Sequence, residues 1–180
     1  MSLLLHGTDI ALRPATRQDR HPIFEWLAHS DLTPLMLGPP TFPENPAPTW
    51  VEFVHDYAAS YFDDTAPLQG RCFVIERNGE AIGQINYNAI DPERRATELD
   101  IWLAHSRHAG KGYGPDAIQT LCTYLAETFG CRDVYLAPSR RNAGAVRAYA
   151  KAGFAETPEA PPWFVPDYPD TVVMVKRLLP

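Results

Sequence analysis

Residues 96–114 read ATELDIWLAHSRHAGKGYG, and this stretch predicts the fold around it. Its first half alternates apolar and polar residues, which is typical of a half-buried strand. Its second half carries glycines at positions 110, 112 and 114, and an amphipathic segment up to Phe129 follows at once. A glycine-rich turn between a strand and a helix start leaves backbone N–H groups free to face an anion. The stretch therefore predicts a strand, a phosphate-binding turn and a helix.

The strand in this stretch, expected over residues 97–104, presents two carboxylates on one face. Successive side chains of a strand point to opposite faces of the sheet. Glu98 and Asp100 therefore share one face with Trp102, whereas Leu99 lies on the other face with the apolar side chains. If that face borders a cleft, the two carboxylates can hold a cation or accept a proton.

The flanking segments predict an α+β fold with a mostly antiparallel sheet. Asn78-Gly79 separates two apolar runs and is the strongest hairpin signal in the chain. The other expected elements are a strand at 9–15, a helix capped by Thr16, a proline-rich loop at 32–48, a helix at 50–62, a helix at 112–129, a strand at 132–137, a helix from Asn142 to Gly153, and strands from Phe154 and over 171–178. This element order places helices on both faces of the sheet.

Length and composition predict one cytoplasmic domain. A chain of 180 residues is long enough to bury a core without disulfides. Cys72, Cys122 and Cys131 have no paired spacing, which indicates reduced, buried thiols. The N-terminal residues lack the basic and apolar parts of a signal peptide, and no segment is long and apolar enough for a membrane span. The net charge of −6 argues against nonspecific nucleic-acid binding, so neither nucleic acid nor membrane is expected as a partner.

The charge is unevenly distributed along the chain. Residues 105–151 hold seven basic and three acidic side chains and so carry a net charge of +4. The rest of the chain therefore carries −10, which gives the total of −6. This asymmetry predicts a polyanionic ligand held by the C-terminal half and a cationic ligand met by the N-terminal half, although ordinary surface patterning is the alternative interpretation.

Two motifs resemble those of a known family. Arg107-x-x-Gly110-x-Gly112, after a strand and before a helix, resembles the acetyl-CoA signature of the GCN5-related N-acetyltransferases (GNAT). NAGAVRAYAKAGF at 142–154 is similar to the second signature of that family. The resemblance implies a single N-acetyltransferase domain over residues 1–180. Its mixed, mostly antiparallel sheet would have six to seven strands with helices on both faces, splayed between the fourth strand, at 97–104, and the fifth, at 132–137.

The resemblance also implies acetyl-CoA as co-substrate and no metal. Glycines keep side chains away from the pyrophosphate, and pantetheine bonds the backbone of the splayed strand. The residues expected at the cofactor are Leu103, Ala104, Arg107, His108, Ala109, Gly110, Lys111, Gly112, Tyr113, Gly114, Asn142, Ala145 and Tyr149. His105 and His108 have no third ligand beside them, so we expect them at the surface or near phosphate rather than on a metal.

The resemblance assigns chemistry to three side chains. Acetyl transfer needs a neutral amine and a proton for the departing thiolate. Tyr149 is the candidate acid, with core packing as the alternative interpretation. Asp100 is the candidate base or the anchor of a cationic substrate, and Glu98 on the same face is a candidate for either task. The alternative interpretation is that both carboxylates are solvated charges on a half-exposed strand.

Within the family, the motif spacing looks like that of the aminoglycoside 6′-N-acetyltransferases and the related acyltransferases of siderophore pathways. Ala137 and the short turn at 91–95 depart from the aminoglycoside pattern, which puts an antibiotic-resistance role in doubt. The acceptor is therefore expected to be a small cationic amine, aminoglycoside-like or hydroxylysine-like, with a protein N-terminal amine as the alternative. Further carboxylates for a polycation are sought among Asp63, Asp64, Asp167 and Asp170.

Two other classes of protein compete with this interpretation. A dinucleotide-binding oxidoreductase would place its glycine turn after the first strand of a parallel unit, whereas three antiparallel strands precede the turn here. A non-catalytic acyl-CoA sensor on the same fold would share every cofactor motif and differ only in lacking turnover. The sequence leaves a homodimer open.

Overall fold

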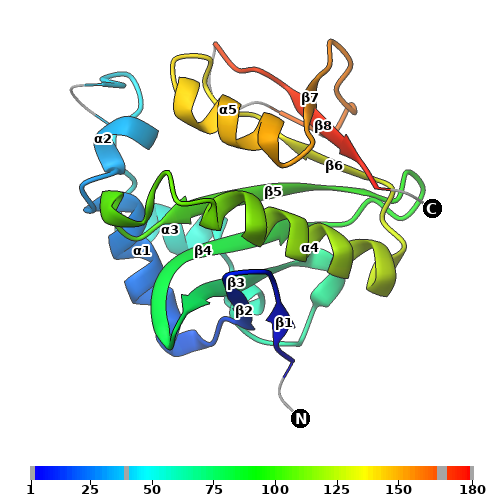
Figure 1. The fold of residues 1–180 in the computed structure, drawn as a ribbon, viewed down its shortest axis with the longest axis horizontal. Coiled ribbons are helices and arrows are strands. Elements are labelled where there is room, and N and C mark those ends of the chain that lie inside the picture. The colour runs from blue at the N-terminus through cyan, green and yellow to red at the C-terminus, as the bar shows by residue number, and fades with distance from the viewer. Residues whose placement is uncertain (1–2, 39–40, 166–169, 179–180) are drawn as a thin grey trace.

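A single twisted sheet runs through the molecule in the order β1-β2-β3-β4-β5-β6-β8-β7 (Figure 1). The computed structural model describes residues 3–38, 41–165 and 170–178. The strands are β1 (Leu5–His6), β2 (Ala11–Pro14), β3 (Gly70–Arg77), β4 (Glu80–Asn88), β5 (Ala96–Leu103), β6 (Asp133–Leu136), β7 (Ala155–Glu156) and β8 (Met174–Arg177). All neighbours are antiparallel except β5 and β6. The predicted mixed sheet is confirmed, with eight strands among the described residues where six to seven were expected; the two-residue β1 was not predicted.

The helices lie on both faces of this sheet, as predicted (Figure 1). The α-helices are α1 (Arg20–Ala28), α2 (Thr33–Met36), α3 (Trp50–Asp56), α4 (Tyr113–Phe129) and α5 (Ala143–Lys151). Short 3-10 helices are η1 (Arg17–Asp19), η2 (Ala59–Phe62), η3 (Pro67–Gln69) and η4 (Ser106–His108). The chain between α1 and α3, expected to be a loop, contains α2, because Pro34 falls in the first helical turn, where no N–H partner is lost.

Local sequence signals explain where most elements begin and end. Asn78 and Gly79 both have positive φ, 51° and 78°, as the tight β3–β4 hairpin requires. Thr16 and Thr49 each form a capping box with the acidic residue three positions on. Gly130 ends α4 in the left-handed conformation, at φ 63°.

The helix expected over 50–62 is shorter than predicted. It ends at Asp56, and the separate η2 follows. Val51 is 73% exposed, whereas Phe53 is fully buried. The larger aromatic ring removes more apolar area from water, so it takes the inner face.

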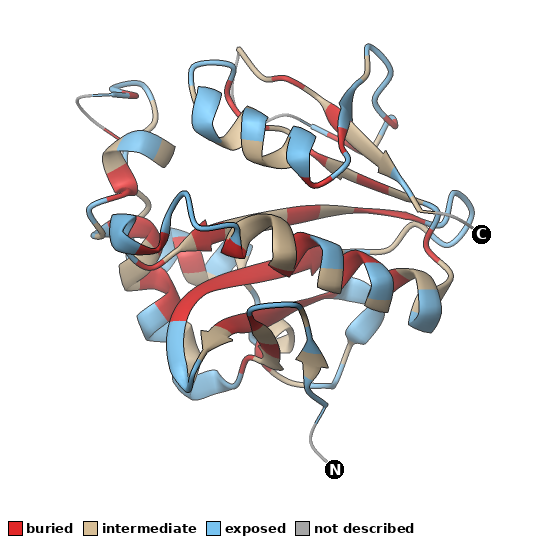
Figure 2. Ribbon diagram, viewed as in Figure 1, coloured by how far each residue is buried: buried red, intermediate tan, exposed pale blue. Residues whose placement is uncertain are grey.

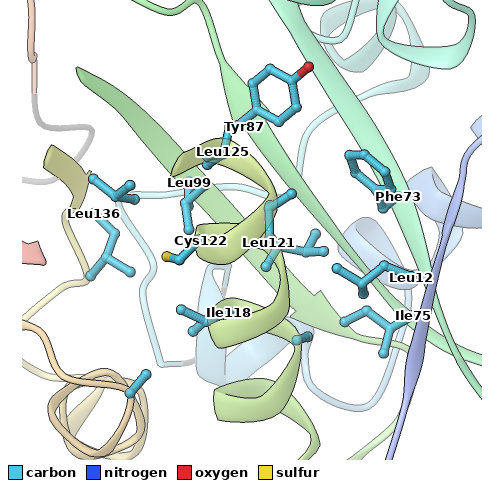
Figure 3. Close-up of a cluster of buried hydrophobic side chains, with 14 of the residues drawn as sticks. Leu12, Phe73, Ile75, Tyr87, Leu99, Ile118, Leu121, Cys122, Leu125 and Leu136 are labelled. Carbon is cyan, nitrogen blue, oxygen red and sulfur yellow. The ribbon is translucent and has the colours of Figure 1, made fainter. Parts of the chain in front are cut away.

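Two apolar cores sandwich the sheet. One lies between the sheet and α4, where Leu12, Phe73 and Ile75 gather around Leu121 (Figure 3). The other joins the opposite face to α1 and α3 and includes Trp102. Figure 2 shows buried residues along the central strands and exposed ones on the outer turns of α4. Leu99 belongs to the first core and Trp102 to the second, which confirms the predicted division of the two faces of β5.

The predicted splay lies between β5 and β6. Their parallel ladder pairs Ala96 with Asp133 and ends where Glu98 meets Tyr135. β5 continues to Leu103 and stays paired with β4 on its other edge. Five residues of β5 therefore face the diverging side without a ladder to β6.

Leu121→Ala should test how much the α4 core contributes to stability. The Leu121 side chain is fully buried between α4 and the sheet, so truncation leaves a cavity. We expect the free energy of unfolding to fall by about 2–5 kcal/mol in urea denaturation. Thr123→Ala, on the exposed side of the same helix, should change it by less than about 0.5 kcal/mol. Equal effects of the two substitutions would contradict the packing described here.

Candidate active site

A cleft of about 420 Å³ opens where β5 leaves β6. β5 supplies one wall, from Glu98 to Trp102, and the chain after β6 and the helix α5 supply the opposite wall. The segment from α2 to α3 covers the remaining side. The lining residues are Leu27, Met36, Leu37, Asn45, Pro46, Pro48, Asp56, Tyr57, Glu98, Leu99, Asp100, Ile101, Trp102, Leu136, Ala137, Pro138, Ser139, Asn142, Ala145 and Tyr149.

The three predicted catalytic residues all line this cleft. Glu98 and Asp100 are half-buried on the β5 wall, and Tyr149 is half-buried on the α5 wall. Asn142 accepts a hydrogen bond from the Ala145 N–H at 3.1 Å through its side chain, so it caps α5 and fixes the start of the helix that carries Tyr149. The β5 stretch and the α5 segment, which are far apart in sequence, therefore face each other across one cleft.

Carboxamides and phenols surround the two carboxylates. Asn86 Nδ2 donates to Asp100 Oδ2 at 3.2 Å, and Asn88 Nδ2 donates to the same oxygen at 3.3 Å and to Glu98 Oε2 at 3.2 Å. Burial and then the negative charge of Asp100 raise the pKa of Tyr61 to about 12 and that of Tyr57 well above its usual range. Both phenols therefore remain protonated at neutral pH and serve as hydrogen-bond donors rather than bases.

The glycine turn lies at the start of α4, at one end of β5. Gly110 and Gly112 have φ of 72° and 89°, a conformation that other residues rarely adopt. A Cβ built on Gly110, Gly112 or Gly114 would meet no atom within 4 Å, so the space beside each glycine is open. The first helical bond runs from the Asp116 N–H to the Gly112 carbonyl, and the N–H groups before it point out of the helix end.

In the connector before this turn, the side chain of Arg107 makes hydrogen bonds within the protein. Arg107 Nη2 donates to Glu80 Oε1 at 2.8 Å, and Arg107 Nε donates to His108 Nε2 at 3.2 Å. His108, expected at the surface or near phosphate, is buried, and this burial lowers its pKa. Arg77 stacks on the ring of Tyr113, with 5.0 Å from its Cζ to the ring centroid. With Lys111 these groups line a second cavity of about 280 Å³.

At its C-terminal end, β5 is hydrogen-bonded to β4 on one edge, and its other edge faces the splay from β6. The Ala104 N–H donates to the Ile82 carbonyl at 2.9 Å, so that group belongs to the sheet. Adjacent residues of a strand direct their backbone groups to opposite edges, which turns those of Leu103 toward the diverging side. Of the two residues predicted to meet pantetheine, Leu103 therefore has the better placed backbone.

Of the extra carboxylates sought for a polycation, Asp63, Asp64 and Asp170 are described and do not line the cleft. Asp63 pairs with Arg17 at 3.0 Å, Asp64 pairs with the buried Arg71, and Asp170 bonds Ser139 at 2.9 Å. Asp167 lies outside the described residues. The structure instead brings Asp56 of α3 to the cleft, a residue whose place the sequence did not predict.

The described residues contain neither a metal-binding cluster nor a membrane-spanning helix. Within residues 3–38, 41–165 and 170–178, no group of three or more His, Cys, Asp or Glu side chains is arranged to hold a metal ion. No helix in the same ranges combines the length and apolarity needed to cross a membrane.

The curated relatives of this sequence are amine acetyltransferases. An aminoglycoside N(6′)-acetyltransferase type 1 of Klebsiella pneumoniae is 27% identical over 178 residues, covering 89% of this chain and 84% of the relative. A spermine/spermidine N(1)-acetyltransferase of Bacillus subtilis is 34% identical over 80 residues, which span 44% of this chain and about half of that relative (49%).

Solved structures show the same fold. A spermidine N-acetyltransferase from Vibrio cholerae, in complex with CoA and spermine, has a TM-score of 0.71 at 21% identity and covers 94% of this chain and 96% of its own. The aminoglycoside acetyltransferase AAC(6′)-Ib with coenzyme A and kanamycin has a TM-score of 0.67 at 23% identity, covering 93% and 94%.

A family profile described as an acetyltransferase (GNAT) domain matches residues 9–155. This match confirms the family and the enzyme class that the two sequence motifs predicted and, because GNAT enzymes use acetyl-CoA, the expected donor. Because it spans well over half of the sequence, the chain belongs to the GNAT acetyltransferase family.

Proposed function

We propose that this protein transfers an acetyl group from acetyl-CoA directly to a primary amine of a small cationic acceptor. The observation that carries the proposal is the cleft between β5 and α5, which presents Asp100 and Glu98 on one wall and Tyr149 on the other. A cationic amine bound by the carboxylates would lie between them and the tyrosine.

The residues at the splay fit the co-substrate. Open space beside Gly110, Gly112 and Gly114 leaves room for a pyrophosphate against the N-terminus of α4, whose dipole favours negative charge. Backbone groups on the diverging edge of β5, at Leu103, are available to an amide-containing chain. Acetyl-CoA supplies the thioester carbonyl that an amine attacks.

Tyr149 is proposed as the general acid. Its ring packs against Phe154 with centroids 6.4 Å apart, and its helix is held by the Asn142 cap, so the phenol keeps its place in the cleft. A phenol is a proton donor suited to a departing thiolate, whose conjugate acid has a comparable pKa.

Direct transfer is favoured over a covalent enzyme intermediate. Cys72, Cys122 and Cys131 are all free and buried. Burial raises the pKa of Cys122 to about 12 and of Cys131 to about 11, so at neutral pH neither offers a thiolate. Burial and the charge of Asp100 raise the pKa of Cys72 as well. Free thiols and the use of acetyl-CoA favour a cytoplasmic location.

The acceptor is proposed to carry more than one positive charge. Asp56, Glu98 and Asp100 all line the cleft, which suits polyamine-like or aminoglycoside-like amines of the kind named for the relatives. The proposal does not require the homodimer that the sequence leaves open, because all the groups it assigns come from one chain.

Gly112→Ala should weaken the binding of coenzyme A. The added methyl group forces a strained backbone at φ 89° and enters the open space beside the turn. We expect the Kd for coenzyme A, measured by calorimetry, to rise about tenfold or more. Gly153→Ala is the matched control, since Gly153 has a similar φ of 91° at the end of α5. A Kd that rises equally in both variants would point to general destabilisation instead.

Asp100→Asn should impair acetylation of a panel of amines containing putrescine, spermidine, kanamycin, lysine and a peptide N-terminus. With wild-type protein we expect acetyl-CoA-dependent thiol release for the multiply charged amines. The variant keeps the shape but loses the charge, so kcat/KM should fall about a hundredfold. Glu127→Gln, on the exposed side of α4, is the control and should leave it unchanged. If no amine releases thiol although coenzyme A binds, the protein is a sensor.

Tyr149→Phe should slow the chemical step without loss of cofactor binding. Removing only the hydroxyl deprives the leaving sulfur of its proton source, so kcat should fall about a hundredfold or more. The KM for acetyl-CoA should stay within about twofold of the wild-type value, because the hydroxyl acts in the transition state and not in the binding of the co-substrate. Tyr124→Phe, which loses a half-buried hydroxyl in the α4 core, should keep wild-type kcat. Wild-type kcat in Tyr149→Phe would remove this residue from the mechanism.

A further inference from the structure

A row of three carboxamides lies beside the two carboxylates, on the neighbouring strand. Gln84, Asn86 and Asn88 occupy alternate positions of β4, so their side chains share one face of the sheet. Asn86 pairs with Asp100 across the β4–β5 ladder. Gln84 and Asn86 are fully buried, which is costly for polar side chains unless their hydrogen bonds are made. We call these three residues the carboxamide row.

Hydrogen bonds run along the carboxamide row toward the cleft. Gln84 Nε2 donates to Asn86 Oδ1 at 3.2 Å, and Asn86 Nδ2 donates to Asn88 Oδ1 at 2.9 Å. Asn86 Nδ2 also donates to Asp100 Oδ2, and Asn88 Nδ2 donates to both Asp100 Oδ2 and Glu98 Oε2. The Tyr61 hydroxyl donates to Asn88 Oδ1 at 3.1 Å. Every amide in the row thus turns its NH₂ group toward the acidic end.

This direction matches the charged form of the carboxylates. An ionised carboxylate only accepts hydrogen bonds, and the Asn88 atom that touches both carboxylates is the nitrogen. Asn88 Oδ1 then faces Asn86, which must present its own nitrogen, and Asn86 Oδ1 in turn faces the nitrogen of Gln84. The far end of the row has a cost, since the buried Gln84 Oε1 has no hydrogen-bond partner among the residues that the structure describes.

The row gives the carboxylates three N–H donors that never titrate. Hydrogen bonds to the charged form of an acid lower its pKa, and amides have no proton to release at any accessible pH. An acid with a lowered pKa is a weak base, because general bases work best when their pKa lies near the operating pH. Asp100 receives two of the three donors on one oxygen, so the effect falls mainly on this residue.

We propose that the carboxamide row keeps Asp100 and Glu98 ionised together and that Asp100 anchors the acceptor's ammonium group rather than serving as the base. Asn86 and Asn88 are then positioning residues for the acceptor site. This inference rests on the proposed function and decides between the two tasks that it leaves to Asp100. Proton removal from the amine falls to solvent in the half-exposed cleft.

Other charged and titratable groups surround Asp100. Tyr57, Tyr61 and Cys72 face it from the residue after α3, from η2 and from β3, and all three remain neutral because their pKa values are raised. The like charges of Glu98 and Asp56 oppose ionisation of Asp100, and Tyr149 lines the opposite wall. A bound cation relieves this repulsion, so the site favours positively charged acceptors.

The test replaces the shared donor. Asn88→Leu removes both N–H bonds to the carboxylates at similar size, and Asn88→Asp keeps polarity but adds a third carboxylate. Carboxyl ¹³C shifts of Asp100 and Glu98, assigned by Asp100→Asn and Glu98→Gln, are followed by NMR titration. In wild-type protein we expect the Asp100 carboxyl to titrate below the ordinary range of an aspartate, because two N–H donors stabilise its charged form. Either Asn88 variant should raise its pKa by about one unit.

A second measurement follows acceptor binding. The Kd of putrescine, which stays doubly protonated below pH 8, is measured by calorimetry between pH 4 and 7 with coenzyme A present. Binding should be lost about one pH unit higher in the Asn88 variants than in wild-type protein. Thr97→Val is the matched control: it loses the bond from the Thr97 hydroxyl to the Asn88 carbonyl, at 2.8 Å, and touches neither carboxylate. It should lower Tm without moving either titration.

An Asp100 pKa near 6 or above in wild-type protein would overturn the proposal and restore Asp100 as the base. An unchanged Asp100 pKa in folded Asn88→Asp protein would also overturn it. Because the NMR titration needs no acceptor, it tests the carboxamide row even if no amine in the panel is acetylated. Failure of the row and failure of the proposed function are therefore distinguishable.

Discussion

The early end of the β5–β6 ladder is the feature on which the site depends. Three residue pairs join the strands, and beyond Glu98 the two backbones separate. Unpaired backbone groups are costly unless water or a ligand satisfies them, so this edge is prepared for a partner that carries amide groups. The same separation makes room for the cleft, because Asp100 lies on the part of β5 beyond its ladder with β6. The proposed cofactor edge and acceptor wall thus arise from one break in the sheet.

Helix α4 holds the other end of this arrangement in place. Its inner side chains, among them Leu121, are buried against the sheet, which fixes the direction of its N-terminus (Figure 3). Asp116 in its first turn accepts hydrogen bonds from the N–H groups of Thr8, Asp9 and Ile10, at 2.9, 2.7 and 3.2 Å. The N-terminal hairpin is therefore tied to the helix that begins at the glycine turn, and the turn is supported from outside the cleft.

Features set by neighbouring residues could be predicted from the sequence, and features set by distant ones could not. The Asn78-Gly79 hairpin, the Gly130 helix end and the two faces of β5 follow from local conformation and period. The place of Asp56 and of Tyr57 in the cleft depends on how α3 packs across the sheet, which no local pattern shows. The sequence shows amides at alternate positions 84, 86 and 88, but not that they lie beside the β5 carboxylates. That contact depends on the register that places Asn86 opposite Asp100.

The uneven charge of the sequence acquires a different explanation in three dimensions. Arg107 of the basic segment pairs with Glu80, and Arg141 pairs with Glu44 and Asp170. Basic side chains of residues 105–151 are thus partly neutralised by acidic side chains from other segments. Exposed pairs of this kind contribute little to stability and are screened by salt. The half-buried carboxylates of β5 are screened less. A preference for cations should therefore come from these few residues in the cleft and not from the net charge of −6.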